Sequence, residues 1–267
     1  MPASSASGHA LVTGASAGIG AALAREYARR GRALVLTARR VDRLESLANE
    51  LRKQVDCVVI PADLEDPNAP GELCETLRKR GIEIGLLVNN AGYGLPGAFL
   101  TPSWQQHQKF LQIMVTAVCE LSYRLLPAMQ ARGHGGILNV ASLAGHVPGS
   151  AGHTLYAASK AFMIKFSQSL ALENAKSGVQ VCALCPGFTY SEFHDVTGTR
   201  QQMKKMPVWM WSDADSVARQ GIEALERGDV MFVPGRVNRL IKAVTQLMPD
   251  RMSLALVQRR SKDFRKL

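Results

Sequence analysis

The apolar positions of this chain follow two patterns that alternate along it. Short runs of aliphatic and β-branched residues predict strands, and longer segments with apolar residues at helical spacing predict helices. The predicted strands are 9–14, 33–38, 55–63, 84–90, 135–142, 179–187 and 230–233. The predicted helices are 19–31, 41–53, a segment ending at Arg80, about 103–131, about 155–176 and about 213–227.

This alternation predicts the fold. Near-continuous apolar runs are typical of strands that are buried on both faces of a sheet. A strict succession of strand and helix implies parallel strands joined by right-handed crossovers. We therefore expect an α/β fold with a single Rossmann-like doubly wound parallel sheet of about seven strands flanked by helices. In such folds ligands bind at the carboxyl ends of the strands.

The regular rhythm breaks after Pro186. Residues 190–211 are irregular and rich in methionine and aromatic residues, and we interpret them as a substrate lid that faces a loop at 146–154. Residues 236–267 have apolar positions at helical spacing with nine Lys or Arg and two Asp. Because no repeat or linker separates these parts, we expect one catalytic domain over 8–235 and a basic amphipathic C-terminal extension over 236–267.

The lid segment indicates a class of substrate. Methionine adapts to irregular shapes, so a small hydrophobic carbonyl compound or alcohol fits its composition. Packing of the lid onto the domain explains the same residues equally well. The apolar residues concerned are Phe193, Met203, Met206, Trp209, Met210 and Trp211.

The net charge of +10 leaves the partners of the basic extension open. It is suited to peripheral contact with an anionic membrane, to covering the site or a partner subunit, or simply to solvation. Nucleic-acid binding is not expected, because the basic residues lack the interleaved aromatics that stack on bases. The beginning of the chain does not resemble a signal peptide, and no apolar stretch is long enough to span a bilayer.

The five cysteines indicate a cytoplasmic protein. Their odd number provides no pairing framework for a secreted fold, and a reducing compartment suits them better. Cys182 and Cys185 have the spacing of a redox pair but lie in the predicted strand 179–187, so we interpret them as core residues. Because no cysteine or histidine pairs stand at zinc spacing, we expect no metal site.

A glycine-rich turn follows the first predicted strand in "TGASAGIG", residues 13–20. Glycine allows a tight turn and a close approach to a ligand. The next helix starts here, and its N–H groups and dipole favour a diphosphate. The turn therefore predicts a dinucleotide site. Its candidate residues are Gly14, Ser16, Gly18, Ile19 and Gly20.

The end of the second predicted strand indicates which dinucleotide binds. An NAD-preferring site usually has an acidic residue here for the ribose hydroxyls, whereas this chain has Ala38, Arg39 and Arg40. A guanidinium can bind a 2′-phosphate in a bidentate manner. We therefore expect NADP(H), with Arg39 as the first contact and Arg40 as support, although two solvated arginines would also fit. Asp63 either binds the adenine amino group or caps a helix.

The fourth predicted strand ends in "NNAG", residues 89–92. We expect Asn90, Ala91 and Gly92 to lie against the ribose of the cofactor, because Gly92 permits a close backbone approach. Asn89 is a candidate for a structural role in which it bonds neighbouring strand ends.

These motifs resemble those of the short-chain dehydrogenase/reductase family over roughly residues 8–235. The resemblance rests on TGxxxGIG, NNAG, Ser142 at a strand end, "YAASK" at 156–160, and Pro186–Gly187. Each motif is weak alone, but their order and spacing together are specific. The resemblance implies an oxidoreductase that interconverts a secondary alcohol and a ketone, or an aldehyde, by hydride transfer.

The resemblance also assigns the catalytic roles. Tyr156 would be the general acid/base, Lys160 would favour its phenolate and bind the nicotinamide ribose, and Ser142 would hold the substrate oxygen. A free phenol has a pKa of about 10, and Lys160 lies one helical turn further along. Without the glycine-rich turn, the same residues would be interpreted as an interfacial aromatic, a solvated charge and a turn residue.

Further contacts follow from the resemblance. Pro186, Gly187, Thr189 and Ser191 would lie at the nicotinamide carboxamide, although Thr189 or Ser191 would also serve as a helix cap. The family also implies a homo-oligomer, a dimer or a tetramer, formed through the long helices that follow NNAG and begin at YAASK.

One position departs from the family pattern. Met114 stands where the family usually has an asparagine that holds a water for proton supply to the lysine. A thioether is a weak hydrogen-bond acceptor, so we expect this relay to be altered or missing. The alternative function is therefore a catalytically weak nucleotide-sensing or scaffold protein on the same fold.

Overall fold

The centre of the molecule is a parallel sheet. The computed structural model describes residues 8–95, 97–152, 154–190 and 208–264 of the chain. Within them, seven strands pair in the order β3-β2-β1-β4-β5-β6-β7, and every pairing is parallel. This order confirms the predicted doubly wound sheet. The strands are β1 (His9–Thr13), β2 (Leu34–Thr37), β3 (Cys57–Val59), β4 (Ile84–Asn89), β5 (Gly135–Val140), β6 (Val179–Leu184) and β7 (Met231–Phe232).

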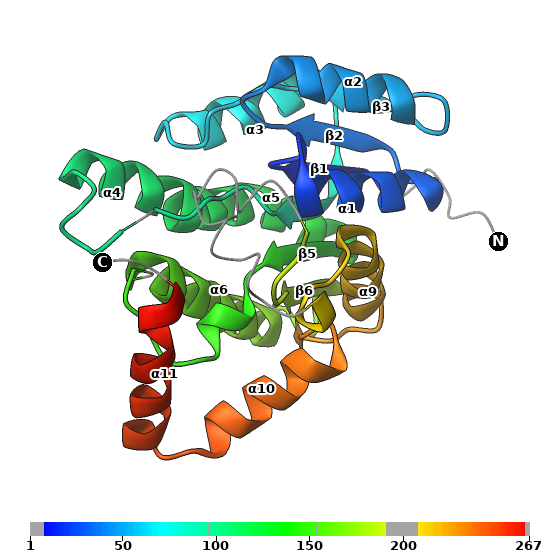
Figure 1. The fold of residues 1–267 in the computed structure, drawn as a ribbon. Coiled ribbons are helices and arrows are strands. Elements are labelled where there is room, and N and C mark those ends of the chain that lie inside the picture. The colour runs from blue at the N-terminus through cyan, green and yellow to red at the C-terminus, as the bar shows by residue number, and fades with distance from the viewer. Residues whose placement is uncertain (1–7, 96, 153, 191–207, 265–267) are drawn as a thin grey trace.

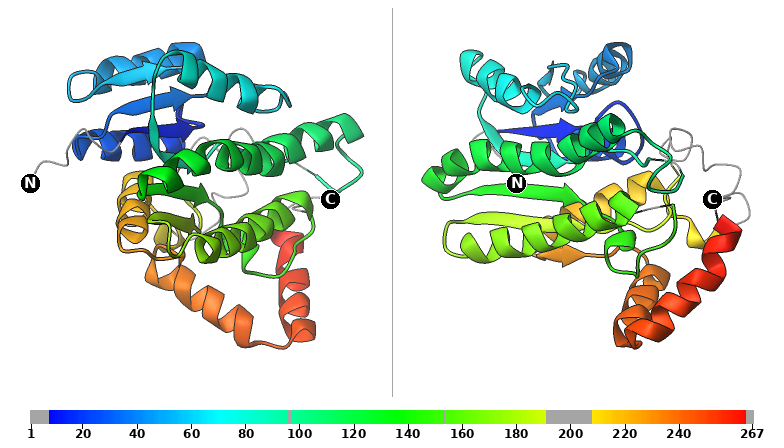
Figure 2. Two further views of the ribbon diagram at one scale, coloured as in Figure 1. Left: turned by 180° about the vertical axis from the view of Figure 1, so that it is seen from behind. Right: turned by 90° about the vertical axis from the view of Figure 1, so that its left-hand side faces the viewer.

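Helices cover both faces of the sheet (Figures 1 and 2). Successive side chains of a strand point to opposite faces, and in β1 Ala10 and Val12 pack on one core while Leu11 packs on the other. The first core is completed by α1 (Gly18–Arg29), α2 (Val41–Leu51) and α9 (Ala214–Glu226). The second is completed by α3 (Ala69–Lys79), α4 (Trp104–Leu111), α5 (Ala117–Arg132) and α6 (Thr154–Glu173).

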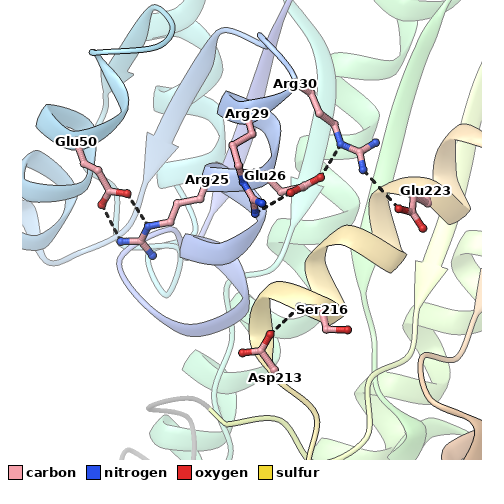
Figure 3. Close-up of polar contacts among 8 residues, drawn as sticks. All are labelled: Arg25, Glu26, Arg29, Arg30, Glu50, Asp213, Ser216 and Glu223. Carbon is pink, nitrogen blue, oxygen red and sulfur yellow. Dashed lines mark hydrogen bonds and ion pairs between the residues drawn. The ribbon is translucent and has the colours of Figure 1, made fainter.

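Polar contacts join the helices of the first face (Figure 3). Arg25 of α1 binds Glu50 of α2 with Nε to Oε1 at 2.8 Å, and Arg30 lies between α1 and Glu223 of α9. The Asp213 carboxylate caps α9 by accepting a hydrogen bond from the Ser216 N–H at 2.9 Å. Each exposed ion pair contributes only about 0–1 kcal/mol, so apolar packing holds these helices while the pairs fix their orientation.

The predicted helix at 103–131 is not uniform. A capping box between Ser103 and Gln106 begins α4, in the usual pattern of a serine followed three residues later by a glutamine. A π-helical turn, η2 (Gln112–Thr116), then separates α4 from α5. Such a turn shifts the side chains that follow it around the helix axis. Met114 lies in this turn and is completely buried.

The C-terminal extension forms two helices, α10 (Arg236–Leu247) and α11 (Asp250–Phe264), which project as an arm beyond the β7 edge of the sheet (Figures 1 and 2). The arm is not separate from the domain, because Asn238 at the start of α10 is buried. None of the described helices is long and apolar enough to cross a membrane.

Cys182 and Cys185 are core residues, as expected. Both side chains are fully buried as free thiols, one against each of two apolar clusters. Burial raises the pKa of each thiol to about 12, which leaves them unreactive at neutral pH.

Candidate active site

The carboxyl ends of the strands meet at one edge of the sheet, where the arrowheads point in Figure 2. At the end of β1 the chain turns through Gly14, whose φ is +65°, and Gly18, whose φ is +56°. A Cβ at Gly14 would lie 2.8 Å from the Ala91 Cα. The turn is therefore a backbone cradle that larger residues cannot form.

The cradle is suited to a diphosphate. Helix α1 begins at Gly18 after an N-cap of Ala17, which has no side-chain oxygen, and its first turn contains no acidic residue. Helix N–H groups and the positive end of the dipole attract an anion at such a place. Gly20 is buried, and a Cβ there would collide with the Gly14 carbonyl and the Asn90 side chain. Ile19 packs on the first core. These residues fit the dinucleotide predicted from the sequence.

The NNAG segment fastens the cradle from the neighbouring strand. The Thr13 hydroxyl accepts hydrogen bonds from the Asn90 and Ala91 N–H groups at 3.0 and 3.1 Å. The Asn90 side-chain amide donates to the Thr13 and Gly14 carbonyls at 2.9 and 3.2 Å. Asn90 thus shapes the glycine turn. Sequence reasoning missed Thr13, although a buried threonine before a glycine turn is a signal that could have identified it.

Asn89 makes hydrogen bonds of the structural kind that the sequence suggested for it. Its side-chain amide donates to Asn139 Oδ1 at 2.9 Å and to the Ser122 hydroxyl at 3.3 Å. Asn139 in turn donates to Ser167 of α6 at 2.9 Å. This buried network joins β4 and β5 to the helices that cover them.

The two arginines after β2 make different contacts. Arg40 donates from Nε and Nη2 to the Ser16 hydroxyl at 3.3 and 3.1 Å, so it lies at the glycine turn. Arg39 is exposed, and its Nη1 is 2.7 Å from Glu65 and 4.0 Å from Asp63. Asp63 also accepts from the Glu65 N–H at 3.1 Å. The guanidinium that reaches the cradle therefore belongs to Arg40, whereas Arg39 is held by two carboxylates.

Ser142, Tyr156 and Lys160 converge beyond the ends of β5 and β6. Ser142 begins the short helix η3 (Leu143–Gly145), and its hydroxyl accepts from the Ala144 N–H at 3.1 Å. Lys160 lies on α6 one turn after Tyr156, with Nζ 5.8 Å from the centre of the tyrosine ring. The three predicted catalytic residues are thus brought together.

The electrostatics of this group are dominated by burial. Burial raises the pKa of Tyr156, while its hydrogen bond with Ser142 acts in the opposite direction. Lys160 is almost completely buried and donates to the Val140 carbonyl at 2.7 Å. Burial lowers the pKa of its ammonium to about 8. Tyr156 is therefore a protonated phenol at neutral pH, and Lys160 titrates close to neutrality.

Met114, which the resemblance predicts to stand where the family has an asparagine, lies against the NNAG segment. A Cβ at Gly92 would lie 2.5 Å from the Met114 sulfur, so the thioether fills the space against NNAG. The π-turn positions this side chain, and sequence periodicity did not indicate the turn.

The Pro186–Gly187 segment packs between η3 and α10. The Pro186 carbonyl accepts from the Leu143 N–H at 2.8 Å, and the Thr189 hydroxyl donates to the Gly187 carbonyl at 3.1 Å. A Cβ at Gly187 would lie 2.5 Å from Asn238 Oδ1. Asn238 is a site neighbour that sequence reasoning missed, because nothing in the pattern of α10 distinguishes it.

The two ends of the predicted lid are in contact where the structure describes them. Tyr190 N–H donates to the Ser212 carbonyl at 3.0 Å, and the Tyr190 and Trp211 rings stack at 4.7 Å. Ser191, Phe193, Met203 and Met206 lie outside the described residues. Among the residues that the structure describes, no group of three or more His, Cys, Asp or Glu could hold a metal ion.

The chain is similar to several known proteins. A family model described as short chain dehydrogenase matches residues 8–202. Nodulation protein G of Rhizobium sp. strain N33 is 36% identical over 230 residues, which cover 85% of this chain and 92% of that protein.

Two solved structures are similar over most of their length. The bulky-bulky ketone specific alcohol dehydrogenase from Comamonas testosteroni has a TM-score of 0.75 at 30% identity, and the match covers 91% of this chain and 95% of that one. A short-chain dehydrogenase from Sphingobium yanoikuyae, solved in complex with NADPH, has a TM-score of 0.77 at 29% identity, with coverage of 91% and 97%.

Proposed function

We infer the activity from one premise: this chain belongs to the short-chain dehydrogenase/reductase family. The family consists of oxidoreductases, and we propose that this member is an NADP(H)-dependent enzyme that interconverts a hydrophobic secondary alcohol and a ketone, or an aldehyde. The observation that carries the proposal is the convergence of Ser142, Tyr156 and Lys160 beside the glycine cradle.

The choice of NADP(H) rests on charge. The residue after β2 is Ala38, and a carboxylate at this position would repel a 2′-phosphate. The Arg40 guanidinium lies against Ser16 of the cradle. A guanidinium is the side chain best suited to bind a phosphate in a bidentate manner. The Sphingobium yanoikuyae relative, solved in complex with NADPH, adds support. We therefore propose the reverse of the order expected from the sequence, with Arg40 as the first contact, because it lies at Ser16, and Arg39 as the supporting one.

The three catalytic residues divide the work of carbonyl reduction. The bound cofactor would supply the hydride. The Ser142 hydroxyl donates to the carbonyl oxygen and orients it, and the Tyr156 phenol gives that oxygen its proton. The raised pKa of Tyr156 keeps the proton in place until charge develops on the oxygen. In the oxidative direction Tyr156 must lose this proton, and the Lys160 ammonium lowers the cost of that step.

Several surfaces match the partners expected from the sequence. Tyr123 on α5 and Phe162 and Leu172 on α6 are exposed apolar side chains, which supports a homo-oligomer formed through these helices.

We propose a cytoplasmic location, because the five cysteines are free thiols. The relatives give no support to the membrane contact of the basic arm, which stays a prediction.

Removal of the phenolic oxygen of Tyr156 tests its proposed role as proton donor. We expect Tyr156→Phe to reduce ketone turnover by about 10²-fold or more, because it removes the proton donor, while NADPH affinity changes little. NADPH absorbance would measure turnover on a panel of ketones and aldehydes, and fluorescence titration would measure affinity. Full activity without the phenol would refute the assigned role. If the wild-type protein binds NADPH but reduces no compound of the panel, the result favours the alternative, a nucleotide-sensing or scaffold protein, which Met114 also favours.

A further inference from the structure

A buried histidine lies beside the proposed catalytic tyrosine. His107 is on α4 and is only 5% exposed, on the same buried helix face as Phe110. Its Nε2 is 2.8 Å from the Phe99 carbonyl oxygen. Because a carbonyl oxygen only accepts, Nε2 carries the proton in this bond. In the neutral imidazole the other nitrogen, Nδ1, is then an acceptor.

The acceptor nitrogen of His107 has no hydrogen-bond partner among the residues that the structure describes, although it is buried. The imidazole ring cannot rotate to give Nδ1 a partner without losing the hydrogen bond from Nε2 to the Phe99 carbonyl. The Phe99 ring stacks on the imidazole at 4.8 Å and 25°, and the Trp104 ring packs against it in a tilted arrangement at 6.3 Å. A buried acceptor without a donor costs free energy, so its presence at this position calls for a ligand or a water.

The space beside this histidine also reaches Tyr156. A cavity of about 20 Å³ is lined by His107, Phe110, Leu155 and Tyr156, among others, and no Asp, Glu, Lys or Arg of the described residues lines it. A cavity of that volume has room for one water-sized group. Its lining therefore combines apolar residues with the proposed proton donor and with the histidine whose Nδ1 is a buried, unpaired acceptor.

We propose that His107 Nδ1 is a specificity-determining acceptor in a subsite for a hydroxyl group of the substrate. The inference rests on the proposed function and narrows it. The substrate would be a hydrophobic ketone or aldehyde that carries a hydroxyl, or a similar small donor, apart from its carbonyl. The hydroxyl donates to Nδ1 while the carbonyl oxygen lies at Tyr156. An analogue with a methyl group in that place would leave the buried acceptor unpaired.

Matched pairs of ketones test the subsite. Acetophenones that bear a hydroxyl or a methyl group at the ortho, meta or para position differ little in size, and only the hydroxyl donates. We expect the wild-type enzyme with NADPH to favour the hydroxyl compound by about fivefold in kcat/KM at one ring position or more, which corresponds to one neutral hydrogen bond. A wild-type enzyme without this preference at any ring position would overturn the proposal.

Two substitutions separate the two nitrogens of His107. His107→Gln places an amide N–H near the Nε2 position, so it can still donate to the Phe99 carbonyl, but it removes the acceptor at Nδ1. We expect its preference for the hydroxyl compound to fall to about 1. His107→Asn places an amide oxygen near the Nδ1 position, and we expect it to keep the preference. Gln108→Ala, an exposed position on the same helix, is the matched control and should retain the wild-type ratio.

The ratio of the two kcat/KM values distinguishes recognition from structural support. If His107→Gln slows both compounds equally and keeps their ratio, His107 only anchors the loop at Phe99 and the proposal is wrong.

A binding measurement separates the subsite from catalysis. Calorimetry of the NADP⁺ complex should show about fivefold tighter binding of the preferred hydroxyacetophenone than of its methyl analogue. Equal affinities would refute the subsite, whereas a clear difference without turnover would refute only the proposed reaction.

Discussion

Lys160 is a charged group that folding removes almost completely from water. Its pKa falls to about 8, from a usual value of about 10.4 in an unfolded chain. The unfolded chain therefore binds more protons than the native one between pH 8 and 10.4, and the free energy of unfolding rises with pH in this window. Below pH 8 the cost of the buried ammonium is present in full.

The first prediction follows from this cost. At pH 7 we expect Lys160→Met to be more stable than wild type by roughly 3 kcal/mol, since one pKa unit corresponds to about 1.4 kcal/mol. The advantage should shrink as the pH rises from 8 to 10.4. Urea unfolding of both proteins at pH 7 and pH 10 would measure it. A difference that does not depend on pH would mean that Lys160 is not the group that titrates.

A second residue-scale prediction concerns the arginines after β2. Arg40 contacts Ser16 in the cradle, whereas Arg39 is paired with Glu65 and Asp63. We expect Arg40→Ala to raise the KM for NADPH about tenfold, in line with the loss of a charge-assisted hydrogen bond, and to change the KM for NADH little. Arg39→Ala is the matched comparison and should have the smaller effect. If both substitutions raise the KM for NADPH equally, Arg40 is not the preferred contact of the 2′-phosphate.

At the scale of elements, the sheet was predictable because each strand is an apolar run between glycine or polar turns. The residues at the strand ends were predictable for the same reason: the motifs at Gly14, Asn90 and Ser142 follow directly after strands. The π-turn was not predictable, since Phe110, Ile113, Met114 and Ala117 also fit an ordinary helix. The partner of each arginine depends on side-chain packing between loops, which periodicity does not encode.

At the scale of the whole molecule, the boundary placed at residue 235 cuts through a packed contact. Asn238 is 6% exposed, its amide donates to the Pro234 carbonyl at 2.8 Å, and its side chain covers Gly187. Helix α10 therefore supports the segment proposed to lie at the nicotinamide. Hydrophobic periodicity identified α10 as amphipathic but could not show which of its residues reach the domain.

The last prediction tests this support. Asn238→Ala removes the bond to Pro234 and leaves a gap over Gly187, so we expect a loss of stability of about 1–2 kcal/mol together with a higher KM for NADPH. Arg239→Ala, an exposed neighbour in the same helix, should change neither quantity. Urea unfolding and initial rates at several NADPH concentrations would measure both. If Asn238→Ala lowers stability but leaves the KM unchanged, α10 stabilises the edge of the sheet without positioning Gly187, and the extension is a structural support outside the site.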